Sequence, residues 1–225
     1  MGSMLQLGSA AAKSYNTAYL LTPEQARAYE EGWIHIHDFD FYALTTTCCQ
    51  IDIDRLFTNG FNTGHGYLRE PQDIQSYAAL ACIAIQSNQN DQHGGQGIPN
   101  FDYALAKGVK KTYRRLLIEN LRKALSILAP EAAVDKQAAT EIVDAAAEKA
   151  GGPSLGRNEA YVRALCEGLQ ARFDEALARQ ALDFTLRESA QEINRRTYQA
   201  MESVVHNLNS MHSRAGAQTP FSSIN

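Results

Sequence analysis

The chain has 225 residues, with 21 lysines and arginines against 25 aspartates and glutamates, which gives a formal net charge of −4 at pH 7. This balance argues against a general nucleic-acid binder, because such proteins need clustered cations to displace counterions from phosphates. The hydrophobic fraction of 44% is that of a globular protein with one large or two small domains. No apolar run reaches the roughly 20 residues that span a bilayer. The four cysteines show no disulfide framework, so we expect reduced thiols in a cytoplasmic protein without membrane contact.

The first predicted helix begins at Thr22-Pro23-Glu24-Gln25, where Thr22 can cap the helix and Pro23 suits its first turn. Gly32 ends it. Residues 33–42 follow with apolar side chains in alternation, which predicts a strand. That strand would place His35 and His37 together on one face.

Strand, loop and helix patterns then alternate. Residues 44–54 are polar and β-branched, which predicts a further strand, and residues 59–66 predict a glycine-bearing loop. A helical apolar pattern starts at Pro71 and reaches Ile85. Residues 87–97 are rich in carboxamides and glycine, and they predict a loop.

From about residue 104 the patterns are helical. Helices are predicted over residues 104–129 and 131–150, with a stop at Gly151-Gly152-Pro153, and Asn158 can cap a last helical region. The apolar pattern of that region is too long for one ordinary helix, so it contains a break or packs on a partner helix. Residues 213–225 predict a loop that ends in a short strand.

The spacing of His35 and His37 is the sharpest local feature. Two imidazoles two residues apart on a strand can converge on one small ligand or one metal ion. A zinc site would need further ligands, for which His65, His93 and Cys48 are candidates. The pair is equally compatible with a structural role at the edge of a sheet.

Three other patterns can carry chemistry, and each has a plainer alternative. Cys48 and Cys49 would face opposite sides of a strand, so only one can line a given cavity, and cysteines are most often inert packing. The loop 87–97 can offer carboxamides and backbone N–H groups to a ligand, or it is a solvated loop. Residues 110–123 hold six cations against one anion, which can meet a triphosphate or an acidic partner, or remain solvated.

Four blocks of the sequence, taken together, resemble the anaerobic (class III) ribonucleoside-triphosphate reductases, which are glycyl-radical enzymes. The blocks are IHIHDFDFYALTTTCCQIDID, GFNTGHGYLREPQDI, AIQSNQNDQHGGQGIPNFDY and HNLNSMHSRAGAQTPFSSIN, and they occur in the order that the family has. Each block alone is unspecific, whereas their joint occurrence is highly specific.

The resemblance implies an α/β fold, the ten-stranded α/β barrel of the glycyl-radical enzymes. These residues would form the first part of that barrel, which by itself is of the α+β class, with long helices dominating residues 104–212. Residues 1–103 would be mixed strand and helix with the pocket motifs. Residues 104–212 would be helical and able to form a dimer interface, and residues 213–225 would form a pocket loop and strand. The family is homodimeric and allosteric, and it supplies deoxyribonucleotides for DNA replication.

The chemistry that the resemblance implies is reduction of ribonucleoside triphosphates at the 2′ carbon by a radical route. A glycyl radical, installed by a radical-SAM activating enzyme, oxidises one cysteine to a thiyl radical. Formate supplies the electrons with the help of a second cysteine. The complete family enzyme also holds a structural zinc and binds ATP and deoxynucleotide effectors, whereas no cofactor is expected in this chain itself.

By the same resemblance, Cys48 matches the second active-site cysteine, Cys49 would point away from the substrate, and His35 and His37 border the pocket. We therefore expect the imidazole pair and Cys48 to open into one cavity sized for a sugar. The other matches are with binding positions: Asn88, Asn90, His93, Ser213 and Arg214 for the substrate, and His65, Arg69 and Glu70 for the effector.

Four family features are missing from these residues: the glycyl-radical loop, the Gly-Cys-Arg segment of the thiyl cysteine, the four-cysteine zinc site and the ATP cone. We therefore expect a partial catalytic domain that is inactive by itself, with an open sheet edge and an uncovered apolar face. Two other functions stay open: a metal-dependent hydrolase that uses His35 and His37, and a non-catalytic helical dimerisation module.

Overall fold

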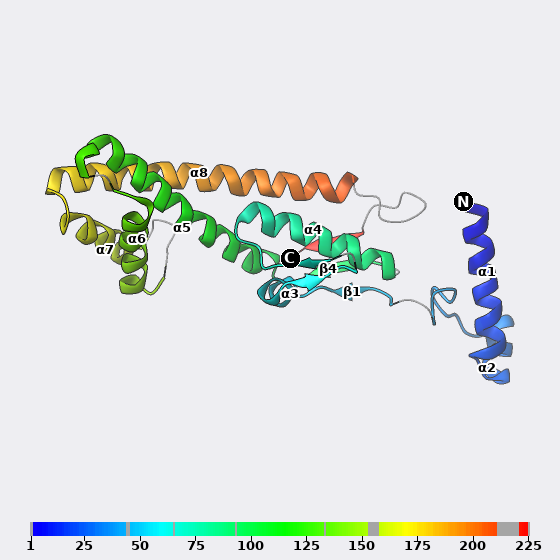
Figure 1. Ribbon diagram of the computed structural model, residues 1–225. Helices are drawn as coiled ribbons and strands as arrows, with labels where there is room; N and C mark the ends of the chain where they lie inside the picture. The colour runs from blue at the N-terminus through cyan, green and yellow to red at the C-terminus, as the bar shows by residue number, and fades with distance from the viewer. Residues whose placement is uncertain are drawn as a thin grey trace. The chain divides into compact units, whose positions relative to one another are not determined.

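The computed structural model describes residues 2–43, 46–64, 66–92, 94–132, 134–152, 158–210 and 221–224. It is mostly helical with a few short strands, as Figure 1 shows. The chain divides into two compact units. Unit 1 comprises residues 1–68, 81–101 and 205–225, and unit 2 comprises residues 69–80 and 102–204. Within the described ranges, no helix is both long enough and apolar enough to cross a membrane.

Unit 1 begins with two helices, α1 (Gly2–Tyr19) and α2 (Pro23–Glu30). The predicted cap of α2 is confirmed: the Gln25 N–H donates to the Thr22 hydroxyl, and the Thr22 N–H donates to the Gln25 side chain. This reciprocal pair satisfies donors that a helix start leaves open. The helix ends two residues before the predicted stop at Gly32, whose φ of 77° suits glycine.

The predicted strand over residues 33–42 is wrong, because this segment runs through turns. Asp38 has a φ of 48°, which lies outside the strand region. Phe39 is buried, its ring lies 4.9 Å from that of Tyr29, and its carbonyl accepts a hydrogen bond from the Asn16 side chain at 2.6 Å. Packing of Phe39 against α1 and α2 therefore outweighs the alternation of apolar residues.

A parallel sheet lies in unit 1. Its strands are β1 (Cys49–Gln50), β4 (Gln96–Ile98) and β5 (Ser222–Ile224), in the order β1-β4-β5. Cys49 pairs with Gln96, and Gln96 pairs with Ser222. Parallel neighbours need long crossovers, which here contain helices. The short strand predicted for the tail is confirmed by β5.

The strand predicted over residues 44–54 is present only in part. β1 covers two of its residues, and helix α3 (Ile53–Asn59) already begins within it, capped by the Asp52 side chain. A hairpin of β2 (Phe61–Asn62) and β3 (Tyr67–Leu68) follows α3. The helix cap at Asp52 therefore ends the β-branched run earlier than its composition predicts.

Helix α4 (Ile74–Asp91) has the predicted apolar positions but extends further than predicted. Tyr77 and Ile85 are buried, as the pattern requires. The loop predicted for residues 87–97 is wrong at its start, where α4 continues. Gln89 is only 3% exposed, so tertiary burial holds these amide-bearing residues in helical form against their weak local signal.

Unit 2 is helical. Its elements are α5 (Phe101–Leu128), the short 3₁₀ helix η1 (Pro130–Ala132), α6 (Lys136–Ala150), α7 (Glu159–Gln170) and α8 (Glu175–Ser210), together with residues 74–80 of α4. Phe101 of α5 and residues 205–210 of α8 belong to unit 1. The predicted signals are confirmed: Asn158 caps α7, and Gly151 ends α6 with a φ of 75°. The long apolar region breaks between α7 and α8, which is one of the two alternatives predicted for it.

The core of unit 2 is a cluster of buried apolar side chains from α5, α6, α7 and α8. Leu117 and Leu125 of α5 are fully buried in it. Gly108 of α5 lies against the Tyr77 ring, where a Cβ atom would come within 2.7 Å of a ring carbon, so this contact requires glycine. The burial of these α5 side chains determines which face of the helix remains available for charged side chains.

Candidate active site

Cys48 immediately precedes β1 and lies against a glycine turn. Its side chain is exposed, and its Sγ accepts a hydrogen bond from the Gly95 N–H at 3.4 Å. A Cβ atom at Gly94 would lie 2.8 Å from this Sγ, and Gly94 has a φ of 107°. The turn therefore needs glycine both for its backbone conformation and for the approach of the thiol. The Cys48 thiol is in contact with backbone and open to solvent.

Cys49 has different surroundings. It is half-buried, and its Sγ accepts a hydrogen bond from Asn88 Nδ2 of α4 at 3.0 Å. The same Nδ2 donates to Gln96 Oε1 at 2.8 Å, and Gln96 is the register partner of Cys49 on β4. The two adjacent thiols therefore contact different groups: Cys48 the backbone of the glycine turn, and Cys49 a carboxamide.

His35 and His37 lie close together on the turn segment that replaces the predicted strand. Both are exposed, their ring centroids are 6.0 Å apart, and their planes are inclined by 56°. His37 Nε2 lies 3.2 Å from the Asp38 carboxylate, which makes an ion pair when the imidazole is protonated. Among the residues that the structure describes, no hydrogen bond, ion pair or ring contact joins either histidine to Cys48.

A metal site at this pair would need further ligands. The described part of the chain contains no group of three His, Cys, Asp or Glu side chains that could hold a metal ion. His65 and His93, the further ligands considered from the sequence, lie outside the described residues. What the structure offers at this point is two exposed imidazoles side by side, a suitable partner for a small anion or a polar ligand.

Of the predicted substrate-binding residues, Asn88 is the one whose side-chain contacts the structure describes. Asn90 lies on α4, but its side chain is outside the described parts, as are His93, Ser213 and Arg214. Gln96 was missed from the sequence, although it is only 3% exposed and bonded to Asn88. A carboxamide in a short strand beside glycines is a weak signal, and only the register with β1 reveals its role.

The predicted effector-binding region has an ion pair at its centre. Glu70 is half-buried and lies 2.5 Å from Lys111 Nζ of α5, which also donates to the Pro71 carbonyl at 3.1 Å. Burial would lower the pKa of Lys111, but the Glu70 carboxylate and the Tyr77 hydroxyl outweigh it and the pKa is raised. Arg69 is exposed, and His65 lies outside the described residues.

The basic stretch 110–123 lies on α5, and several of its cations have partners within unit 2. Arg114 makes a bidentate pair with Asp144 of α6, with N–O distances of 2.7 and 2.6 Å. Arg115 lies 3.4 Å from Asp73, the carboxylate that also accepts from the Ser76 N–H at the start of α4. These pairs lower the positive charge available to a triphosphate, so the stretch serves in part to tie helices together.

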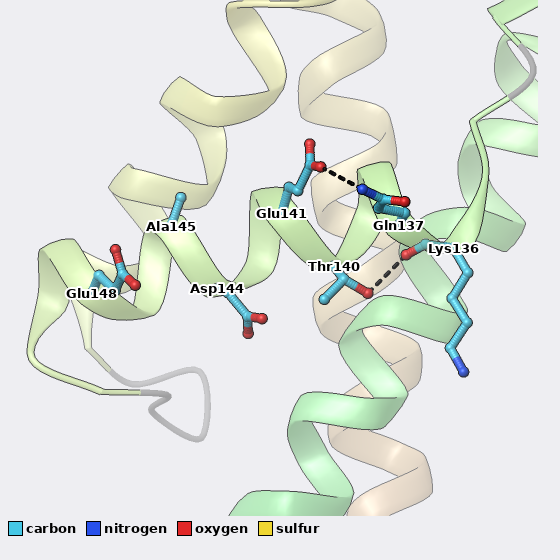
Figure 2. Close-up of a pocket in the computed structure, with 7 residues that line it drawn as sticks. All are labelled: Lys136, Gln137, Thr140, Glu141, Asp144, Ala145 and Glu148. Carbon is cyan, nitrogen blue, oxygen red and sulfur yellow. Dashed lines mark hydrogen bonds between the residues drawn. The ribbon is translucent and has the colours of Figure 1, made fainter.

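Among the described residues, unit 2 has two hollows that contain none of the predicted catalytic, substrate-binding or effector-binding residues, although Lys123 of the basic stretch lines the second. Figure 2 shows the first, of about 720 Å³, on the outer face of α6. Two of its three carboxylates are engaged within the unit, Asp144 by Arg114 and Glu141 by Gln137 and Arg172. The second, of about 350 Å³, lies between α5 and α8, where Glu192 pairs with both Arg195 and Arg196.

Comparison with known proteins gives a consistent result. A family model described as anaerobic ribonucleoside-triphosphate reductase matches residues 1–225. The chain is 32% identical over 91 residues to the anaerobic ribonucleoside-triphosphate reductase of Enterobacteria phage T4, a match that covers 40% of this chain and 15% of that protein. It is 30% identical over 111 residues to proteins of the same name from Salmonella typhimurium and Escherichia coli, covering 48% of this chain and 16% of each. The matched region is thus about a sixth of the length of these relatives.

Proposed function

The chain belongs to the anaerobic ribonucleoside-triphosphate reductase family, and from this premise we propose that it forms part of the pocket in which a ribonucleoside triphosphate is reduced. The proposal rests on the surroundings of Cys48, whose exposed thiol contacts a glycine turn beside a parallel sheet. Membership of the family does not favour the two alternatives considered from the sequence, a metal-dependent hydrolase and a non-catalytic dimerisation module.

We propose that the parallel sheet is the first part of the ten-stranded barrel. Three strands in parallel, with helices in both connections, are what the beginning of an α/β barrel requires. β1 and β5 each have one neighbour among the described strands, so further strands can add at either side.

In the proposed reaction, the ribose loses its 2′-hydroxyl as water after a hydrogen atom has been removed from the 3′ carbon. One ribonucleoside triphosphate, one formate and one proton give one deoxyribonucleoside triphosphate, one carbon dioxide and one water. Cys48 gives a hydrogen atom to the sugar and is restored at the expense of formate. The residues that store and pass the initial radical in the family are not among these 225, and neither is its four-cysteine zinc site.

The other candidate residues take supporting roles in the proposal. His35 and His37 border the pocket, where exposed imidazoles suit formate or a phosphate oxygen. Asn88 contacts the substrate through Oδ1, since its nitrogen already donates to Cys49 and Gln96. The remaining proposed substrate contacts are Asn90, His93, Ser213 and Arg214.

We propose that the protein acts in the cytoplasm as a homodimer, with a radical-SAM activating enzyme as its partner, and that ATP and deoxynucleotides regulate it near His65, Arg69 and Glu70. The Glu70–Lys111 pair supports this location, because a phosphate can replace the carboxylate as the partner of the lysine. A site of this kind at a dimer interface is complete only when two subunits meet.

Titration of the isolated chain with dATP or dTTP is therefore expected to show binding weaker than about 1 μM in a calorimeter. The matched variant is Glu70→Gln, which removes the competing carboxylate from Lys111 and should tighten whatever binding remains. Submicromolar binding by the unaltered chain would contradict the requirement for two complete subunits.

The proposed function is tested by the stoichiometry of the complete enzyme that contains these residues. Under anaerobic conditions, with the activating enzyme and labelled formate, carbon dioxide and deoxynucleotide should form in a ratio of one to one. Omitting formate should stop both products. Deoxynucleotide formation without formate oxidation would exclude the proposed reductant, and the absence of deoxynucleotide from an enzyme carrying its radical would exclude the function.

A further inference from the structure

One carboxamide joins two strands of the sheet. Asn88 Nδ2 donates to Cys49 Sγ at 3.0 Å and to Gln96 Oε1 at 2.8 Å. Cys49 on β1 and Gln96 on β4 are register partners, so their side chains lie next to each other on one face of the parallel pair. Asn88 therefore ties β1 to β4 from α4, which uses both hydrogens of its amide nitrogen.

The backbone ladder between these strands is short. β1 has two residues, and its pairing with β4 is flanked by two bonds, from the Cys49 N–H to the Gly95 carbonyl at 3.1 Å and from the Ile51 N–H to the Gly97 carbonyl at 2.8 Å. A pairing of this length is weak by itself, so a side-chain link adds to what holds β1 in register.

The link that Asn88 makes is buried at its Gln96 end, on β4. Gln96 is 3% exposed, and its Nε2 has no hydrogen-bond partner among the described atoms. Its Oε1 accepts from Asn88, so loss of Asn88 would leave that buried oxygen without this partner. Unpaired buried acceptors are costly, which makes the Asn88 link more than a surface contact.

The Cys48 thiol depends on the same register. Cys48 is adjacent to Cys49, and its Sγ lies against the Gly94–Gly95 backbone that leads directly into β4. Any shift of β1 along β4 therefore moves Sγ away from the Gly95 N–H by a similar amount. The space that the missing Cβ of Gly94 leaves accommodates the thiol in this one register.

We propose that Asn88 is a positioning residue for the Cys48 thiol: by joining Cys49 to Gln96, it holds β1 in the register that places Cys48 Sγ against the Gly94–Gly95 turn. The proposal rests on the proposed function for its importance in turnover. The placement of the thiol can be tested without turnover, so the two can fail separately.

The test measures how fast N-ethylmaleimide labels Cys48 in the 225-residue chain, read by mass spectrometry. The reference is Cys49→Ser, which keeps an acceptor for Asn88 and removes the competing thiol. In Cys49→Ala, and in Cys49→Ser with Asn88→Leu, labelling should be about threefold faster or more, because β1 is no longer tied to β4. Combining Cys49→Ala with Asn88→Leu should add nothing, because both changes break one link.

Equal labelling rates in all four variants would overturn the proposal, and so would additive effects of the two changes. The Cys49→Ser and Cys49→Ala pair differs by one oxygen atom, so it stays informative if Asn88→Leu does not fold. In the complete enzyme, Asn88→Leu should lower kcat about tenfold, in addition to any rise in KM from loss of the proposed Oδ1 contact with the substrate. A rise in KM with unchanged kcat and unchanged labelling would leave Asn88 as a substrate contact alone.

Discussion

Replacing Cys48 by serine in the complete enzyme is expected to abolish deoxynucleotide formation, with a fall in turnover of about 10³-fold or more. A serine O–H bond is much stronger than a thiol S–H bond, so serine cannot give a hydrogen atom to a sugar radical or be restored by formate. The side chains are similar in size, so the Gly94–Gly95 turn should accommodate the change. Turnover of CTP to dCTP and the dissociation constant of CTP should be measured together, and the latter should stay within about threefold.

Cys166→Ser is the matched control for this variant, because Cys166 lies on α7 in unit 2, whereas the glycine turn belongs to unit 1. It should leave turnover close to that of the unaltered enzyme. Normal turnover by Cys48→Ser would remove Cys48 from the chemistry. A loss of CTP affinity equal to the loss of turnover would instead assign the thiol to binding.

Local signals predicted the helices well where the signal and the structure involve the same few residues. The cap at Thr22, the stop at Gly151 and the cap at Asn158 each depend on hydrogen bonds within about one helical turn. Such bonds need no partner from a distant part of the chain. The break between α7 and α8 agrees with the expectation that the whole apolar region is too long for one helix, although α8 with its 36 residues is itself unusually long.

Prediction failed where distant residues decide the conformation. Residues 33–42 alternate like a strand, but burial of Phe39 against Tyr29 and the bond to Asn16 bend them into turns. The start of the 87–97 segment looks like a loop, yet it is helical because its amides have partners elsewhere. In both cases tertiary contacts outweigh the intrinsic conformational preference of the residues, which amounts to about 0–1 kcal/mol per residue.

The residues of the candidate site likewise divide into those that a local motif indicates and those that only tertiary contacts bring together. Cys48 could be singled out from its motif, because the motif lies within one short block of sequence. The link from Asn88 to Cys49 and Gln96 could not, since Asn88 and Cys49 are 39 residues apart and meet only through the pairing of β1 with β4. Lys111 was likewise visible only as one of six cations, and its pairing with Glu70, 41 residues away, appears only in the structure.

Leu117→Ala is expected to lower the free energy of unfolding of unit 2 by about 2–5 kcal/mol. Leu117 is fully buried in the cluster that α5, α6, α7 and α8 share, so truncation removes apolar contacts and leaves a cavity that helices packed on several sides cannot close. Urea denaturation followed by far-UV circular dichroism reports on unit 2, because most of the long helices belong to it.

Leu128→Ala provides the matched control, since the same atoms are removed from the same helix at a position that is 37% exposed. Its effect should stay below about 1 kcal/mol. For Leu117→Ala the midpoint should fall while the slope of free energy against urea is unchanged, which places the loss in the native packing rather than in the denatured state. Equal losses for the two variants would mean that the cluster around Leu117 is loosely packed, which would contradict the prediction.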